Sequence, residues 1–72
     1  MTFGEWLKKE REARNLTQAE FAASAGISRC AYSRSESGAY RHRLYPLTLR
    51  KIASALGYPE QVLTKMKGEL DK

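Results

Sequence analysis

The stretch TQAEFAASAGISRCAYSRSESG, residues 17–38, decides the fold, because it has the pattern of two short helices joined by a tight turn. Thr17 can cap the first helix, and Glu20, three residues later, can complete a capping box. Gly26 can end this helix in the left-handed conformation, which carries no Cβ penalty for glycine. Ser28 is a good N-cap for the second helix. Two helices that cross over a short glycine-containing turn form a helix-turn-helix unit, which we therefore predict here.

The rest of the chain predicts three further helices around this unit. Apolar periodicity and helix-boundary signals place the five helices at about 3–14, 18–25, 29–36, 47–56 and 59–67. The inner face of the first helix is expected to consist of Phe3, Trp6, Leu7 and Ala13. We expect an all-α, compact five-helix domain over residues 1–67, followed by a short C-terminal tail, 68–72.

Several short motifs occur along the chain in an order typical of one family. They are LTQ at 16–18, EFA at 20–22, GIS at 26–28, Glu36, Gly38, IA at 52–53 and ALG at 55–57. On these residues the chain resembles the helix-turn-helix family of the phage Cro and repressor proteins, often called XRE-like, over roughly residues 3–66. The resemblance implies a DNA-binding domain that usually acts as a homodimeric transcriptional regulator. Ser35 departs from the family pattern, which has a bulky apolar residue there, and the loop at 39–47 is long.

Charge is concentrated in one part of the chain. Basic and acidic residues balance within 1–27 and within 52–72, so residues 28–51 account for the whole net charge of +5. Against Glu36, that segment holds six basic residues: Arg29, Arg34, Arg41, Arg43, Arg50 and Lys51. A basic region that coincides with the second helix of a helix-turn-helix indicates a face that binds double-stranded DNA.

Other classes of function lack the residues that they need. Cys30 is the only cysteine and His42 the only histidine, so we expect neither a disulfide nor a metal site. The sequence has no phosphate-binding glycine loop and no nucleophile with a plausible base, so we expect no enzyme activity, no cofactor and no small-molecule ligand. No signal peptide or membrane-spanning stretch is recognisable, and the expected location is the cytoplasm.

The residues that read bases follow from the geometry of the second helix, whose N-terminal half lies in the major groove. If Tyr32 faces inward and packs on Ala22, the outward-facing residues are Arg29, Cys30, Ser33 and Arg34. Arginine can bond guanine through two parallel hydrogen bonds. The family resemblance assigns base contacts to the positions of Arg29, Cys30 and Arg34. Two alternatives stay open: either arginine can contact phosphate only, and Cys30 can be a redox sensor.

Contacts with the DNA backbone are expected from the helix starts and from the long loop. The candidates are Thr17, Gln18, Ser28, Tyr40, Arg41, His42 and Arg43. The resemblance implies that Gln18 bonds a phosphate, whereas Thr17 can use its hydroxyl for the helix cap instead. One loop arginine can enter the minor groove, and the alternative for the loop is a solvated hairpin.

The resemblance also implies a structural ion pair between Arg11 and Glu36. A dimer interface is expected at Tyr58, Val62 and Met66, although Val62 and Leu63 can instead complete the core of the monomer. Together these features predict a homodimeric regulator, most simply an autorepressor, that binds a palindromic operator. The alternative is an antitoxin-like module that masks a partner protein. The sequence does not choose between repressor and activator.

Overall fold

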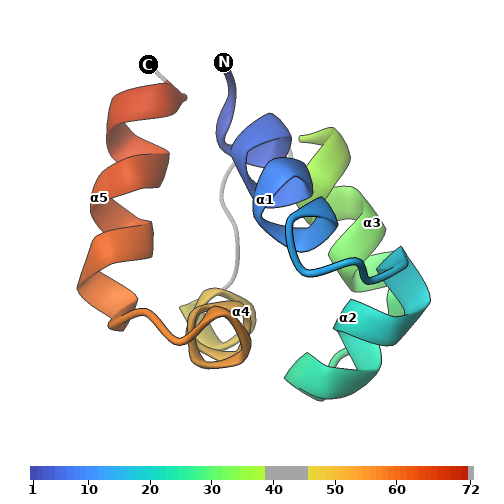
Figure 1. The fold of residues 1–72 in the computed structure, drawn as a ribbon. Helices are drawn as coiled ribbons and strands as arrows, with labels where there is room; N and C mark the ends of the chain where they lie inside the picture. The colour runs from blue at the N-terminus through green and yellow to red at the C-terminus, as the bar shows by residue number, and fades with distance from the viewer. Residues whose placement is uncertain (39–45, 72) are drawn as a thin grey trace.

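The computed structural model describes residues 1–38 and 46–71, which form five helices and no strand (Figure 1). In chain order they are α1 (Phe3–Glu12), α2 (Gln18–Ala25), α3 (Arg29–Ser37), α4 (Pro46–Leu56) and α5 (Glu60–Leu70). The all-α prediction is therefore confirmed. Within the described residues, no helix is both long and apolar enough to cross a membrane.

Local capping explains where the first two helices begin and where the second one ends. Thr2 and Thr17 each accept a hydrogen bond from the backbone N–H three residues later, at 3.1 Å, and Glu5 and Glu20 complete the two capping boxes. Such a box satisfies two N–H groups that a helix start leaves without partners. Gly26 ends α2 with a φ of 73°, a conformation that glycine adopts without strain.

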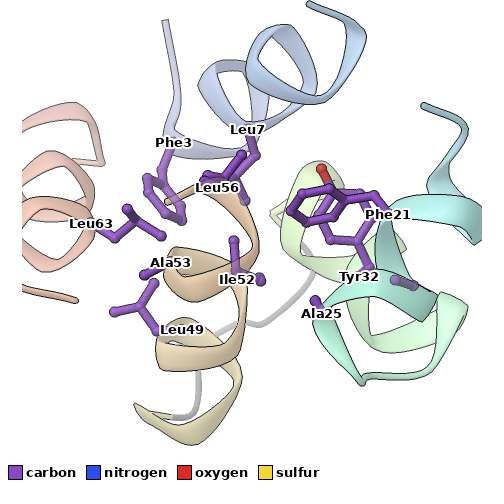
Figure 2. Packing of buried hydrophobic residues seen from close by; sticks show 11 residues of the cluster. Phe3, Leu7, Phe21, Ala25, Tyr32, Leu49, Ile52, Ala53, Leu56 and Leu63 are labelled. Atoms are coloured by element: carbon purple, nitrogen blue, oxygen red, sulfur yellow. The ribbon is translucent and has the colours of Figure 1, made fainter. Parts of the chain in front are cut away.

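One hydrophobic core draws residues from all five helices (Figure 2). α1 packs on α3, α2 packs on both α3 and α4, and α4 packs on α5. The buried apolar residues are Phe3, Leu7, Phe21, Ala22, Ala25, Tyr32, Leu49, Ile52, Ala53, Leu56 and Leu63. The rings of Phe21 and Tyr32 lie 4.7 Å apart between centroids, which ties the two helices of the helix-turn-helix together.

α1 differs from the prediction at its C-terminal end. The helix ends at Glu12, so Ala13 is its C-cap and is exposed, and the expected apolar contact of Ala13 is wrong. Arg11 is buried instead, because its guanidinium has polar partners inside the fold. Trp6 is half-buried and stacks on Phe3 and Tyr58.

The small residues Gly4 and Ser35 let α1 and α3 approach closely. Gly4 is buried, and a Cβ atom built on it would overlap the backbone carbonyl of Glu36 and lie 3.0 Å from that of Ser35. Ser35 is fully buried and donates its hydroxyl to the carbonyl of Ala31 at 3.0 Å. At Ser35, where the chain departs from the family pattern, a small side chain that is hydrogen-bonded within its own helix thus lies where the two helices meet.

α5 runs three residues further than predicted, through Leu70, so most of the expected tail is helical. Asp71 follows, and its Oδ1 accepts a hydrogen bond from the backbone N–H of Phe3 at 2.9 Å. The two ends of the described chain therefore lie side by side (Figure 1).

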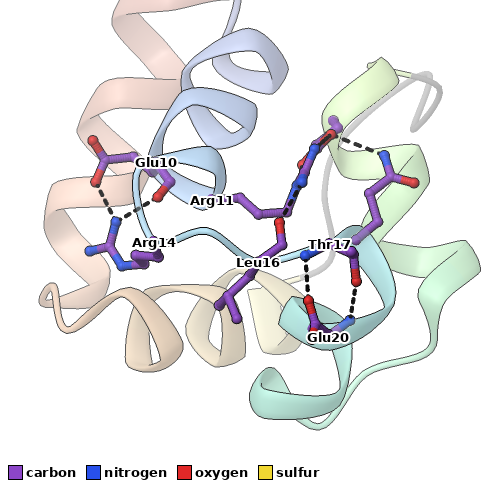
Figure 3. A network of polar contacts seen from close by, with 8 residues as sticks. Glu10, Arg11, Arg14, Leu16, Thr17 and Glu20 are labelled. Atoms are coloured by element: carbon purple, nitrogen blue, oxygen red, sulfur yellow. Dashed lines mark hydrogen bonds and ion pairs between the residues drawn. The ribbon is translucent and has the colours of Figure 1, made fainter.

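A polar cluster joins α1 to the turn between α4 and α5. Arg14 donates to the backbone and side chain of Glu10 at 2.7 and 3.2 Å (Figure 3). It also donates to the carbonyl of Leu56 at 2.9 Å. The Tyr58 hydroxyl donates to the same Glu10 carboxylate at 2.8 Å. The guanidinium lies at the C-terminal end of α4, where a positive charge complements the helix dipole.

Candidate nucleic-acid interface

One face of α3 packs against the rest of the domain, and the opposite face is exposed to solvent. Its buried residues, Tyr32 and Ser35, face the core and the close contact with α1. Arg29, Cys30 and Arg34 are exposed, whereas Ser33 is half-buried. The structure therefore places three of the four expected base-reading residues in solvent and Ser33 at the edge of the packed surface.

The starts of α2 and α3 use the expected side chains as caps. The Ser28 hydroxyl oxygen accepts from the backbone N–H of Ala31 at 3.1 Å, as Thr17 does for Glu20. A hydroxyl that accepts in this way keeps its own proton to donate. Thr17 and Ser28 are both exposed, so each can cap its helix and still donate to a ligand.

The Arg11–Glu36 pair lies inside the protein, between α1 and α3. Arg11 Nε is 2.6 Å from Glu36 Oε2, and Nη2 is 3.3 Å from Oε1. The two side chains are only 10% and 6% exposed. Arg11 also donates to the carbonyl of Leu16 at 2.7 Å, which holds the chain between α1 and α2 in place (Figure 3).

The charges of this pair are strongly stabilised. Burial alone would raise the pKa of the Glu36 carboxyl, but the hydrogen bonds that it accepts from Arg11 and Gln18 help to outweigh burial, and the net pKa shift is downward. Chiefly through its hydrogen bonds to Glu36, the pKa of Arg11 is raised. Both groups are therefore charged at neutral pH.

The Tyr32 hydroxyl is buried near this pair. The hydroxyl group has no hydrogen-bond partner within the described part of the chain. Burial, together with the neighbouring Glu36 carboxylate, raises the pKa of Tyr32, so the phenol stays neutral.

Gln18 does not point freely into solvent. Its Nε2 donates to Glu36 Oε1 at 3.0 Å, and the residue is half-buried. Sequence reasoning missed this contact, because 18 residues separate the two side chains and no local pattern links them. Only the packing of α2 against α3 brings them together.

The described basic residues of the segment 28–51 differ in whether they already have a polar partner. Arg50 Nε lies 3.3 Å from Oε1 of Glu60 on α5, and Lys51 Nζ donates to the backbone carbonyl of Gly26 at 3.4 Å. Arg29 and Arg34, in contrast, have no ion pair with any described residue and are exposed on α3. The remaining basic loop residues and their neighbours, Tyr40, Arg41, His42 and Arg43, lie outside the described residues.

The expected dimer residues differ in their surroundings. Tyr58 is half-buried and bonded to Glu10, and Met66 is half-buried against the core. Val62 is 39% exposed, and Leu63 next to it is fully buried. The alternative that both complete the core therefore fits Leu63 and is wrong for Val62.

Among the residues of 1–38 and 46–71, no group of three His, Cys, Asp or Glu side chains gathers in a way that would hold a metal ion.

Comparison with known proteins gives a consistent picture. The family model described as helix-turn-helix matches residues 7–63. The HTH-type transcriptional repressor RghR of Bacillus subtilis (strain 168) is 37% identical over 71 residues, which are 99% of this chain and 52% of that protein. The uncharacterized HTH-type transcriptional regulator RghRB of the same organism is 35% identical over 68 residues, 94% of this chain and 48% of that protein. The chain thus spans about half the length of both relatives.

Proposed function

Because the chain belongs to the helix-turn-helix family of the Cro and phage repressor type, we propose that it is a sequence-specific DNA-binding regulator of transcription. The proposed regulator is a homodimer that represses its own operon and binds a palindromic operator. The repressor role is supported by the name of the relative RghR.

The observation that carries this proposal is the presentation of α3. Tyr32 and Ser35 anchor the back of this helix, while Arg29 and Arg34 are exposed on it without ion-pair partners among the described residues. Unpaired arginines on a rigid helix suit guanine recognition, because a guanidinium can donate two parallel hydrogen bonds to O6 and N7. Arg34 and Arg29 are the proposed base-reading residues, with Cys30 as a small apolar contact between them.

One recognition helix reaches only a few base pairs, so the proposed operator is read by two copies. The described domain measures 28 × 22 × 22 Å, and half-sites of dimeric regulators lie about 34–36 Å apart. Two copies would therefore occupy successive turns on one side of the duplex. Val62 is the best candidate for their contact, because it is the most exposed of the three expected interface residues.

The first experiment asks whether the protein binds DNA through its charge. Binding to a duplex from its own upstream region should weaken steeply with salt, with a slope of about −0.9 for each neutralised phosphate. We expect protection of a palindrome by two copies, which sedimentation of the complex can count. A salt-insensitive interaction, or a one-to-one complex on a palindromic site, would contradict the proposal.

The second experiment separates base reading from backbone contact. Arg34→Ala should cost about 1–3 kcal/mol on the operator and relax the preference at one base pair in each half-site. Arg43→Ala removes the same charge from the loop, and should weaken operator and random DNA by similar factors. Competition against single-base operator variants measures both effects. If neither substitution changes the preferred base, recognition depends on Arg29 or on DNA shape.

A further inference from the structure

The Glu36 carboxylate joins three helices through hydrogen bonds. Its Oε2 accepts from Arg11 Nε at 2.6 Å, and its Oε1 accepts from Arg11 Nη2 at 3.3 Å and from Gln18 Nε2 at 3.0 Å. A guanidinium that donates to both oxygens of a carboxylate fixes the orientation of that carboxylate. Gln18, the first residue of α2, is therefore held by an acceptor that is itself fixed by α1.

This contact restricts the side chain of Gln18 before any ligand binds. A glutamine amide has two N–H donors, and Glu36 takes one of them. The second N–H has no acceptor among the described residues, and the side chain is only half-buried. Fixing a flexible side chain in advance lowers the entropy that is lost when it binds.

We infer that Glu36 is a positioning residue for DNA binding, which it affects by orienting the second N–H of Gln18 toward a backbone phosphate. This inference rests on the proposed function. Arg11 is the second part of the arrangement, because a carboxylate without its guanidinium partner would repel the phosphate. The ion pair that stabilises the fold thus also determines how one phosphate is bound.

A double-mutant cycle tests the inference. We would measure the affinity of wild type, Gln18→Met, Glu36→Gln and the double variant for labelled duplexes of about 20 base pairs, one from the upstream region and one of random sequence. Phosphate contacts carry no sequence information, so both duplexes should respond alike. Melting curves followed by circular dichroism establish that each variant is folded.

The expected results differ sharply between a positioning and a purely structural role. Gln18→Met should weaken binding about tenfold, the loss of one hydrogen bond to a charged group. Glu36→Gln should weaken it about fivefold in the wild type but less than about twofold in the Gln18→Met background. Glu12→Gln is the matched control: it removes the same charge from an exposed position and should not weaken binding.

Equal losses from Glu36→Gln in both backgrounds would overturn the inference and leave Glu36 a structural role only. If the wild type binds no duplex, the proposed function itself fails. If the wild type binds and Gln18→Met binds equally well, DNA binding stands and the positioning role falls.

Should Glu36→Gln not fold, nuclear magnetic resonance of the Gln18 side-chain amide in the wild type tests the inference instead. One of its protons should exchange slowly with water, both free and with DNA, and rapid exchange of both protons would overturn the inference.

Discussion

Replacing Arg11 with methionine should destabilise the protein severely. The substitution leaves the Glu36 carboxylate, whose side chain is 6% exposed, with a hydrogen bond from Gln18 as its one remaining side-chain bond among the described residues. The carbonyl of Leu16 also loses its guanidinium donor. Removing one partner of a buried ion pair costs about 3–5 kcal/mol, because the other charge stays buried without compensation. A small domain has a total stability of only about 5–15 kcal/mol, so this is a large part of it.

Urea unfolding followed by circular dichroism and by the fluorescence of Trp6 measures this loss. The melting temperature should fall by roughly 12–40 °C, since each kcal/mol is worth about 4–8 °C in a domain of this size. The double variant Arg11→Met with Glu36→Leu should regain most of the stability, because an apolar pair of similar volume leaves no buried charge. A loss below about 1 kcal/mol for the single variant is the value of a surface pair, and would refute the reasoning. So would a double variant as unstable as the single one.

Three further predictions use features of the same fold. The lowered pKa of Glu36 means that its stabilisation is complete above the ordinary value of 4.5 and is lost as the pH falls through the lowered pKa. The stability difference between wild type and Glu36→Gln should therefore shrink in urea titrations at acid pH, and a growing difference would contradict this. Gly4→Ala should destabilise the protein by about 1–3 kcal/mol, because the added methyl group would overlap α3. Gly68→Ala, whose added methyl group faces open space within α5, should stabilise the protein by about 0.5–1 kcal/mol. Melting curves measure both, and equal effects would exclude the close approach of α1 and α3. Leu63→Ala should cost about 2–5 kcal/mol and Val62→Ala less than about 0.5 kcal/mol, and similar losses would show that the burial of these neighbours is misassigned.

The helix starts could be predicted because their signals are local. Thr2 with Glu5, and Thr17 with Glu20, lie three residues apart and form the capping boxes without help from the rest of the chain. The same is true of Gly26, whose left-handed conformation needs only the residue itself. The order of helices and the exposure of α3 follow from these boundaries and from apolar periodicity.

The contacts that determine the site could be predicted only in part. The Arg11–Glu36 pair was expected from family resemblance, but the bond from Gln18 to Glu36 was not. It depends on how α2 packs on α3, which periodicity does not describe. Similarly, the charge count over 28–51 did not reveal that Lys51, which keeps its positive charge, donates a hydrogen bond to the carbonyl of Gly26. Net charge along a sequence does not reveal which charges already have partners.

The hydrogen bond between Asp71 and Phe3 has a consequence for the connectivity of the chain. It joins residues 68 positions apart, so the start of α1 and the end of α5 lie next to each other in this domain. Joining these ends by a few residues would cost little loop-closure entropy. Chain opening could then be moved to the turn between α4 and α5, near Gly57. Such a circular permutant would keep the helix-turn-helix in one uninterrupted segment, with new termini at the turn that Tyr58 and Arg14 now hold against α1.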